Sequence, residues 1–159
     1  MNKFTIVTSI KKFKYEELTA SDQELIDQAK EATATSYSPY SQFSVGAALR
    51  LNNNQIIAGS NQENAAFPSG LCAERTAFFY ASAKFPDEPI QTLAVAARNK
   101  QGFLKDSIPP CGACRQALLE AEGRYKQAIR TLLYGEEWIY EVESISSLLP
   151  LSFQSSSMD

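Results

Sequence analysis

The rest of this chain is arranged around two short stretches, CAER at residues 72–75 and PPCGACR at residues 109–115. The sequence contains three cysteines and no histidine, and all three cysteines lie in these stretches. Cys111 and Cys114 have the CxxC spacing that allows two thiolates to bind one ion from the first turn of a helix. With Cys72 as a third ligand, the two stretches predict one metal centre.

The number of ligands favours a catalytic metal over a structural one. A structural zinc is usually enclosed by four cysteine or histidine ligands, and this chain has three such residues. Three protein ligands and one position for water are typical of a catalytic zinc. Glu74, two residues after Cys72, is then placed to handle the proton of that water. Arg75 is placed to offset the negative charge that three thiolates bring to the ion.

Each of these residues also has an ordinary interpretation. A CxxC pair can be a redox pair, and buried cysteines can serve as small apolar side chains. Glu74 alone fits a solvated carboxylate at a helix start, and Arg75 alone fits a surface arginine. The combination of Cys-Ala-Glu, the CxxC pair and the order of elements favours the metal site over these interpretations.

Length and charge indicate an ordinary globular protein. A chain of 159 residues fits one domain with one core. The net charge of −3 gives no reason to expect nucleic acid or an anionic membrane as a partner. Residues 1–18 lack the apolar region of a signal peptide, and no stretch is long enough to span a bilayer. We therefore expect a cytoplasmic protein, since a reducing compartment keeps thiolate ligands reduced.

Helical spacing and strand-like alternation follow one another along the chain. We expect helices at about 22–36, 72–84, 112–122 and 144–149, and strands at 43–51, 55–60, 92–98, 129–134 and 138–142. Ser21 fits an N-cap with Glu24 completing a capping box, and Gly123 fits the position just after a helix. This order predicts an α/β fold, a three-layer α/β/α sandwich with a mixed five-stranded sheet.

The same pattern divides the chain into three parts. These are a lead-in at residues 1–20, a single catalytic domain at 21–153 and a polar tail at 154–159. Phe4, Ile6, Thr8 and Ile10 alternate with other residues and could form a short strand, but a solvated lead-in is the simpler interpretation. The sequence shows no internal repeat, low-complexity linker or second domain.

The two cysteine stretches resemble the two signatures of the zinc-dependent cytidine deaminases, in the small three-cysteine form of that family. The resemblance extends over residues 22–153 and implies the same three-layer fold. It implies one Zn²⁺ per chain, held by Cys72, Cys111 and Cys114, with Glu74 as the proton carrier that is not a ligand. It also implies hydrolytic deamination of cytidine and deoxycytidine to uridine and deoxyuridine with release of ammonia, as in pyrimidine salvage.

Further resemblances concern the substrate. Asn61 and Glu63 match family residues that bind the ribose 3′-hydroxyl, and Phe43 matches the aromatic residue that lines the base pocket. The remaining residues expected at the substrate site are Ala65, Phe67 and Ala73. Phe67 stands where a tyrosine is common in the family, so one hydroxyl is missing there.

The C-terminal segment LLPLSF at residues 148–153 resembles the end of small homotetrameric cytidine deaminases. In those proteins the aromatic residue that matches Phe153 reaches a neighbouring subunit's pocket, and the residues that match Ala65 and Phe67 also cross the interface. The resemblance therefore implies a homotetramer with shared active sites and a nucleoside as the small-molecule partner. An anchor that fixes the C-terminus to its own domain is an equally good interpretation of Phe153.

Two other functions stay open at this point. The same chemistry could act on another cytosine nucleoside, such as an antibiotic nucleoside, or on a base in nucleic acid, which the acidic charge balance disfavours. Alternatively, the chain could be a non-enzymatic module whose zinc only staples the fold, with a carboxylate or a neighbouring chain supplying a fourth ligand.

Overall fold

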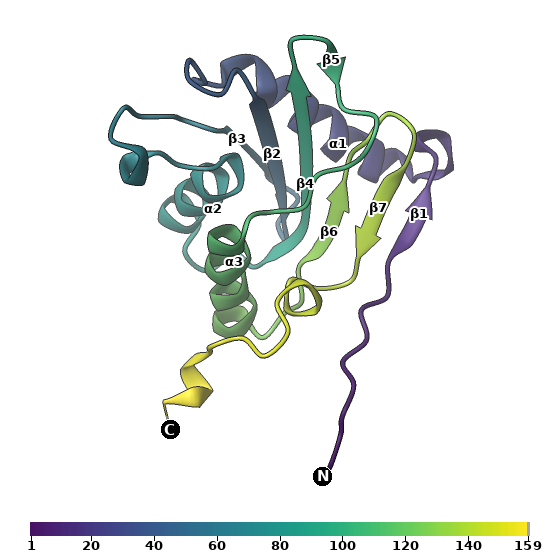
Figure 1. Cartoon of the computed structure of the whole chain (residues 1–159), viewed down its shortest axis with the longest axis vertical. Helices are drawn as coiled ribbons and strands as arrows, with labels where there is room; N and C mark the ends of the chain where they lie inside the picture. Colours follow the sequence, from purple (N-terminus) through teal and green to yellow (C-terminus); the bar gives the residue numbers. More distant parts are fainter. Residues whose placement is uncertain (159) are drawn as a thin grey trace.

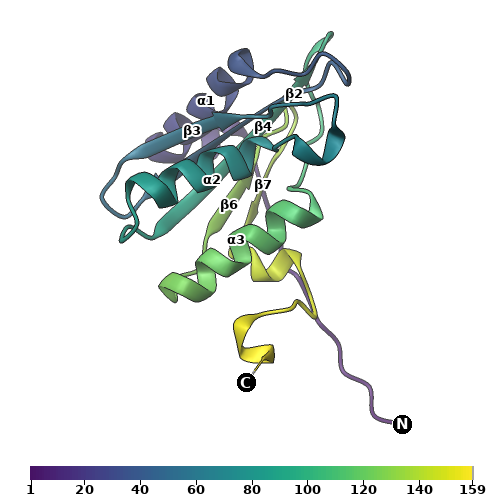
Figure 2. The ribbon, with the colours of Figure 1, turned by 90° about the vertical axis from the view of Figure 1, so that its left-hand side faces the viewer.

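A mixed β-sheet forms the middle layer of the chain, with α1 on one face and α2 and α3 on the other (Figure 1, Figure 2). The computed structural model describes residues 1–158. The helices are α1 Ala20–Ala32, α2 Ala73–Lys84 and α3 Gly112–Tyr125. The strands are β1 Lys11–Phe13, β2 Ser44–Leu51, β3 Ile56–Ser60, β4 Ile90–Asn99, β5 Gly102–Phe103, β6 Arg130–Leu133 and β7 Ile139–Val142.

Strand directions explain why the two cysteine stretches meet. The sheet has the order β1-β7-β6-β4-β2-β3, and the short β5 pairs with β4. Since β2 is antiparallel to both β3 and β4, these two strands point the same way. The next helix after β3 is α2 and the next after β4 and β5 is α3, and both cover the same face of the sheet (Figure 2). Their N-termini therefore lie at the same end of the sheet.

Both faces of the central strands are buried, which explains why β2 and β4 carry apolar residues on both faces. Ala47 and Leu49 of β2 pack in the core under α2 and α3, whereas Ala48 between them packs in the core under α1. A glycine in β3 lets α2 approach closely, because a Cβ on Gly59 would lie 2.6 Å from the backbone nitrogen of Ala77. This close packing fixes the position of α2 relative to β3.

The predicted α/β/α fold class is confirmed, but the sheet has seven strands instead of five. The five expected strands are all present, and β1 and β5 are added. β1 lacks an apolar alternation and pairs with β7 at the edge of the sheet, where Lys11 binds Glu141 at 3.2 Å. The alternating residues 4–10 do not form a strand, because their side chains are exposed and meet no sheet. None of the helices in residues 1–158 combines the length and apolar character that a bilayer crossing requires.

Some predicted helix boundaries were wrong, and one predicted helix is only a single turn. The helix expected to reach residue 36 ends at Ala32 and is followed by a 3-10 turn, Thr33–Thr35. The N-cap of α1 is Thr19, whose side chain accepts a hydrogen bond from the backbone of Asp22, so Ser21 lies inside the first turn. α3 continues past Gly123 and ends before Lys126, which takes the left-handed conformation (φ 52°) expected of the glycine. The helix expected at 144–149 is a single 3-10 turn, Ser146–Leu148. Gly123 does not end the helix, because the backbone N–H of Lys126 still donates to the Glu122 carbonyl.

Candidate active site

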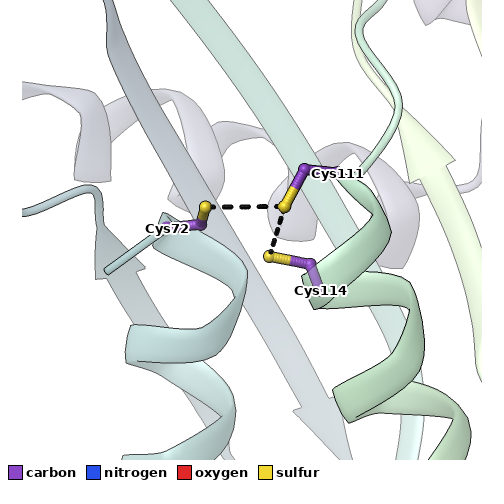
Figure 3. Close-up of side chains that lie close together, drawn as sticks. All are labelled: Cys72, Cys111 and Cys114. Carbon is purple, nitrogen blue, oxygen red and sulfur yellow. Dashed lines mark hydrogen bonds between the residues drawn. The ribbon is translucent and has the colours of Figure 1, made fainter. Parts of the chain in front are cut away.

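The thiols of Cys72, Cys111 and Cys114 point toward one another where α2 and α3 begin (Figure 3). The sulfurs of Cys72 and Cys111 are 3.7 Å apart, those of Cys111 and Cys114 are 3.5 Å apart, and all three lie within 4.8 Å of one another. Tetrahedral zinc with Zn–S bonds of about 2.3 Å holds its sulfur ligands roughly 3.8 Å apart. The spacing of the three thiols therefore fits one zinc ion.

Helix starts place these thiols. Cys72 and Cys111 are the N-cap residues of α2 and α3, and both have extended backbones (φ −72°, ψ 154° and φ −66°, ψ 165°). Cys114 lies one turn into α3, so its side chain shares a face of that helix with Cys111. The N–H groups of a first helical turn carry partial positive charge, which favours thiolates at these positions.

The thiols differ in how readily they lose a proton. Hydrogen bonding from Cys114, and then from Arg75 and Cys111, lowers the pKa of Cys72 to about 5. The bond to Cys72 and burial raise the pKa of Cys114 far above its ordinary value. A coordinating dication removes the proton from a thiol outright and would hold all three sulfurs as thiolates. The donor set therefore suits a soft divalent metal such as zinc.

Arg75 and Glu74 extend the cluster from the first turn of α2. Arg75 Nη2 donates to Cys72 Sγ at 3.7 Å, and its buried Nε has no partner within residues 1–158. Glu74 is 4% exposed, and burial raises the pKa of its carboxyl, which the nearby Cys72 thiolate raises further. The guanidinium thus offsets part of the thiolate charge, and a buried carboxyl lies beside the cluster.

A pocket of about 580 Å³ opens beside Cys72 and Arg75. This volume is in the range that holds small molecules. The other walls come from residues 40–41, 61–64, 67 and 70–71. Arg75 is the one cation among the lining residues, and it already binds Cys72. The pocket lining therefore offers polar groups and a carboxylate to a ligand, while its one cation is already bonded to Cys72.

Asn61 is held in the pocket wall by three hydrogen bonds. Its Oδ1 accepts from Ser36 Oγ at 2.6 Å and from the backbone of Val45 at 2.8 Å, and its Nδ2 donates to the Phe43 carbonyl at 2.9 Å. These bonds join the end of β3 to the start of β2. An amide carries two N–H groups, so the second one is available to a ligand.

Glu63 is also held by its neighbours. Its carboxylate accepts hydrogen bonds from the side chain of Ser41 and from the backbones of Ser41 at 3.2 Å and Tyr40 at 2.9 Å. The bond from the Ser41 hydroxyl, with help from the two backbone bonds, lowers the pKa of Glu63. The residue is thus an ionised acceptor that fixes the loop at residues 40–41 against the pocket.

Four of the expected substrate residues, Phe43, Ala65, Ala73 and Phe153, lie outside the pocket lining within this one chain. Phe43 is half-buried at the start of β2. Ala73 is the first residue of α2 and is fully buried, and Ala65 is exposed on the loop after β3. Their roles toward a substrate remain predictions.

Two expected aromatic residues are exposed. Phe67 is 76% exposed, lines the pocket and packs edge-to-face against Tyr40 with ring centroids 5.9 Å apart. Phe153 is 62% exposed, and its carbonyl accepts a hydrogen bond from Gln116 Nε2 at 3.0 Å. Phe67 is thus exposed in the pocket wall, whereas Phe153 is exposed beside α3.

Sequence reasoning did not single out several residues that build the site. Ser36 holds Asn61, Ser41 holds Glu63, and Leu71 lines the pocket. Serine and leucine are common on loops, and no pattern in the sequence distinguished these from others. Only the fold brings Ser41 to a residue 22 positions away.

Comparisons with known proteins identify one group of relatives. The family model of the cytidine and deoxycytidylate deaminase zinc-binding region matches residues 19–129. A cytidine deaminase of Halalkalibacterium halodurans is 38% identical over 137 residues, which are 86% of this chain and 97% of that protein. A crystal structure of cytidine deaminase from Burkholderia pseudomallei matches with a TM-score of 0.71 and 37% identity, over 86% of this chain and 100% of that one. One from Mycobacterium tuberculosis matches with a TM-score of 0.67 and 27% identity, over 86% and 99%.

Proposed function

The chain belongs to the family of cytidine and deoxycytidylate deaminases, and we propose that it deaminates cytidine and deoxycytidine hydrolytically to uridine and deoxyuridine, with release of ammonia. The observation that carries this proposal is the cluster of three thiols with Glu74 buried beside it. Relatives that match most of the chain, at 38% and 37% identity, are cytidine deaminases.

Each residue of the cluster has a distinct part in this chemistry. Cys72, Cys111 and Cys114 would hold one zinc ion, which supplies the Lewis acid that activates water at neutral pH. Arg75 lowers the net charge of the thiolates through its bond to Cys72. This matters because three thiolates more than neutralise the +2 charge of zinc, which makes the ion a weaker Lewis acid.

Glu74 carries the protons. Its carboxylate takes a proton from the attacking water and delivers it to ring N3, which makes C4 of the pyrimidine electrophilic. It then passes the second proton to the departing amine, so that one water and one cytidine become uridine and ammonia. A carboxyl 4% exposed at the start of α2 is shielded from bulk water, which would otherwise compete for these protons.

The pocket favours a free nucleoside over a nucleotide phosphorylated at the sugar. Asn61 offers an N–H, and Glu63 brings an ionised carboxylate that suits a hydroxyl. A phosphate placed there would meet that carboxylate, while the lining cation Arg75 is committed to Cys72. We therefore place the ribose 3′-hydroxyl at Asn61 and Glu63. Equal use of cytidine and its 3′-phosphate would refute this placement.

We also propose that the enzyme is a cytoplasmic homotetramer whose subunits complete one another's pockets. Support comes from the exposure of Phe67 in the pocket wall and of Phe153 near the C-terminus. Deleting residues 153–159 should reduce activity more than it reduces thermal stability, and the intact protein should elute as a tetramer. A fully active monomer at assay concentration would contradict this.

The test of the function is direct. Deamination changes the ultraviolet spectrum of cytidine, so the absorbance of cytidine or deoxycytidine with purified protein reports turnover, and an ammonia assay confirms the second product. A non-enzymatic zinc module would bind metal without either signal. A panel with other cytosine nucleosides then decides whether cytidine is the preferred substrate.

A further inference from the structure

A single side chain donates a hydrogen bond to the segment that leads into Cys111. Residues 106–110 connect the β4–β5 region to α3, and two of them, Pro109 and Pro110, have no N–H group to donate. Of the hydrogen bonds within residues 1–158, the one that reaches this segment runs from Arg115 Nε to the Pro110 carbonyl, at 2.8 Å. Arg115 therefore holds the Cys111 turn twice, since its backbone N–H donates to the Cys111 carbonyl at 3.0 Å and its side chain bonds the preceding residue.

Packing holds part of this segment, because Pro110 is buried and Ile108 packs against the core. A cavity of about 280 Å³ lies against the segment and is lined by Ser107, Pro109 and Arg115 together with side chains of β6 and β7. The hydroxyl of Ser107 is buried without a partner in the described part of the chain. A cavity gives its lining no partner atoms on one side, so Ser107 and Pro109 have fewer van der Waals contacts than close-packed residues.

A second bond joins the same guanidinium to the end of the chain. Arg115 Nη1 donates to the Leu148 carbonyl at 2.6 Å, at the last residue of the 3-10 turn that precedes the C-terminal segment. A guanidinium is planar and its donors have a fixed geometry. Both carbonyls, Pro110 and Leu148, are therefore fixed relative to the helix that carries Cys114.

We propose that Arg115 is a positioning residue of the metal centre, which holds Cys111 in place for the ion through Pro110 and couples this turn to the C-terminal segment. The inference rests on the proposed zinc site. Cys111 is the exposed member of the three thiols, whereas Cys114 is fully buried in the core. The ligand that packing holds least is thus the one whose backbone Arg115 holds.

The same helix provides a matched control. Arg124 of α3 donates through Nη2 to the Pro86 carbonyl at 3.0 Å, at the far end of the helix from the thiols. Arg115→Ala and Arg124→Ala each remove one arginine that binds a prolyl carbonyl. Arg115→Lys keeps the charge but replaces the planar fork with a single point of donation, so it should hold the two carbonyls less well.

The experiment measures how fast zinc leaves each protein in excess chelator with a coloured zinc indicator, at a temperature where circular dichroism shows all variants folded. We expect release from Arg115→Ala to be at least about tenfold faster than from the unaltered protein, as for other groups that orient metal ligands. Arg115→Lys should lie between them, and Arg124→Ala should match the unaltered protein.

A purely structural role would lower the melting temperature without changing zinc release from the folded protein, and that result overturns the proposal. If Arg115→Ala does not fold, Arg115→Lys decides, and a release rate equal to that of the unaltered protein overturns it. An unaltered protein that holds zinc and deaminates cytidine while the variants release zinc normally refutes this inference alone. An unaltered protein without zinc refutes the proposed function as well.

Discussion

The two faces of the sheet differ in whether their buried acids have cations as partners. On the face covered by α1, Arg130 donates to Asp22 of the helix and, at 2.8 Å, to Glu141 of β7. The side chains of both acids are 10% exposed, and Lys11 adds a second bond to Glu141 at 3.2 Å. Each acid in this network has a cation within reach, so the network is complete within the chain.

On the face covered by α2 and α3, acids outnumber cations. Three thiols and the buried Glu74 lie together, and Arg75 is the cation that bonds to them. Buried acids without matching cations cost stability and have shifted pKa values. Such clusters are typical of functional sites. The α1 face therefore balances its buried charges within the chain, whereas the thiols on the other face are balanced by a metal. Changes on one face should affect activity and changes on the other should affect stability.

Removing zinc should have the largest effect, because it leaves the thiol cluster with Arg75 alone to balance it. A chelator should abolish deamination, and about one equivalent of zinc per chain should restore it. Metal analysis of the purified protein and the ultraviolet assay check this. Active protein that contains no zinc would contradict the site assignment.

Replacement of Glu74 by Gln should come next. The amide cannot carry protons, so kcat should fall at least about a hundredfold while zinc content and fold are kept. Glu120→Gln, an exposed glutamate of α3, is the matched control and should leave kcat unchanged. Near-normal turnover of Glu74→Gln would remove this residue from the mechanism.

Replacement of Arg130 by Met tests the opposite face. It leaves Asp22 without Arg130 and Glu141 with Lys11 alone, which should cost about 2 kcal/mol of unfolding free energy, less than for a fully buried pair because the Arg130 side chain is 34% exposed. Urea unfolding measures the loss. The kcat of the folded variant should be unchanged, and a fall in kcat at full stability would show that the two faces are not separate.

Replacement of Glu63 by Ala should affect substrate binding with little effect on the fold. Loss of a hydrogen bond to a charged group is worth about 1.5 kcal/mol or more, so KM for cytidine should rise roughly tenfold. Ser41→Ala keeps the carboxylate and loses one of its holding bonds, so its KM should rise less. Equal KM values for all three proteins would exclude Glu63 from the sugar site.

The smallest expected effect is at the start of α1. Thr19→Ala removes the N-cap bond to Asp22 and should cost about 1 kcal/mol of stability without changing kcat. Ser21→Ala, at the position where the sequence predicted the cap, should cost little. The reverse order of the two losses in urea unfolding would show that the helix begins at Ser21.

Much of the fold could be predicted because its elements carry local patterns. The apolar runs of β2 and β4 and the helices after each cysteine stretch follow from spacing over a few residues. β1 could not be predicted, since Lys11–Phe13 is held by pairing with β7 and by ion pairs from a strand about 130 residues away. The cap at Thr19 was missed because Ser21 and Glu24 satisfy the same local rule.

The three cysteines were predicted as ligands from the sequence alone, because the chain has three cysteines, no histidine and a glutamate beside the first cysteine, and the structure brings their sulfurs together. Which charges are matched depended on the folded chain. Asp22 and Arg130 are 108 residues apart, and Arg115 reaches a carbonyl 33 residues away. Such contacts depend on where side chains of different elements come together in space. Neither periodicity nor motif spacing indicates which distant residues will meet.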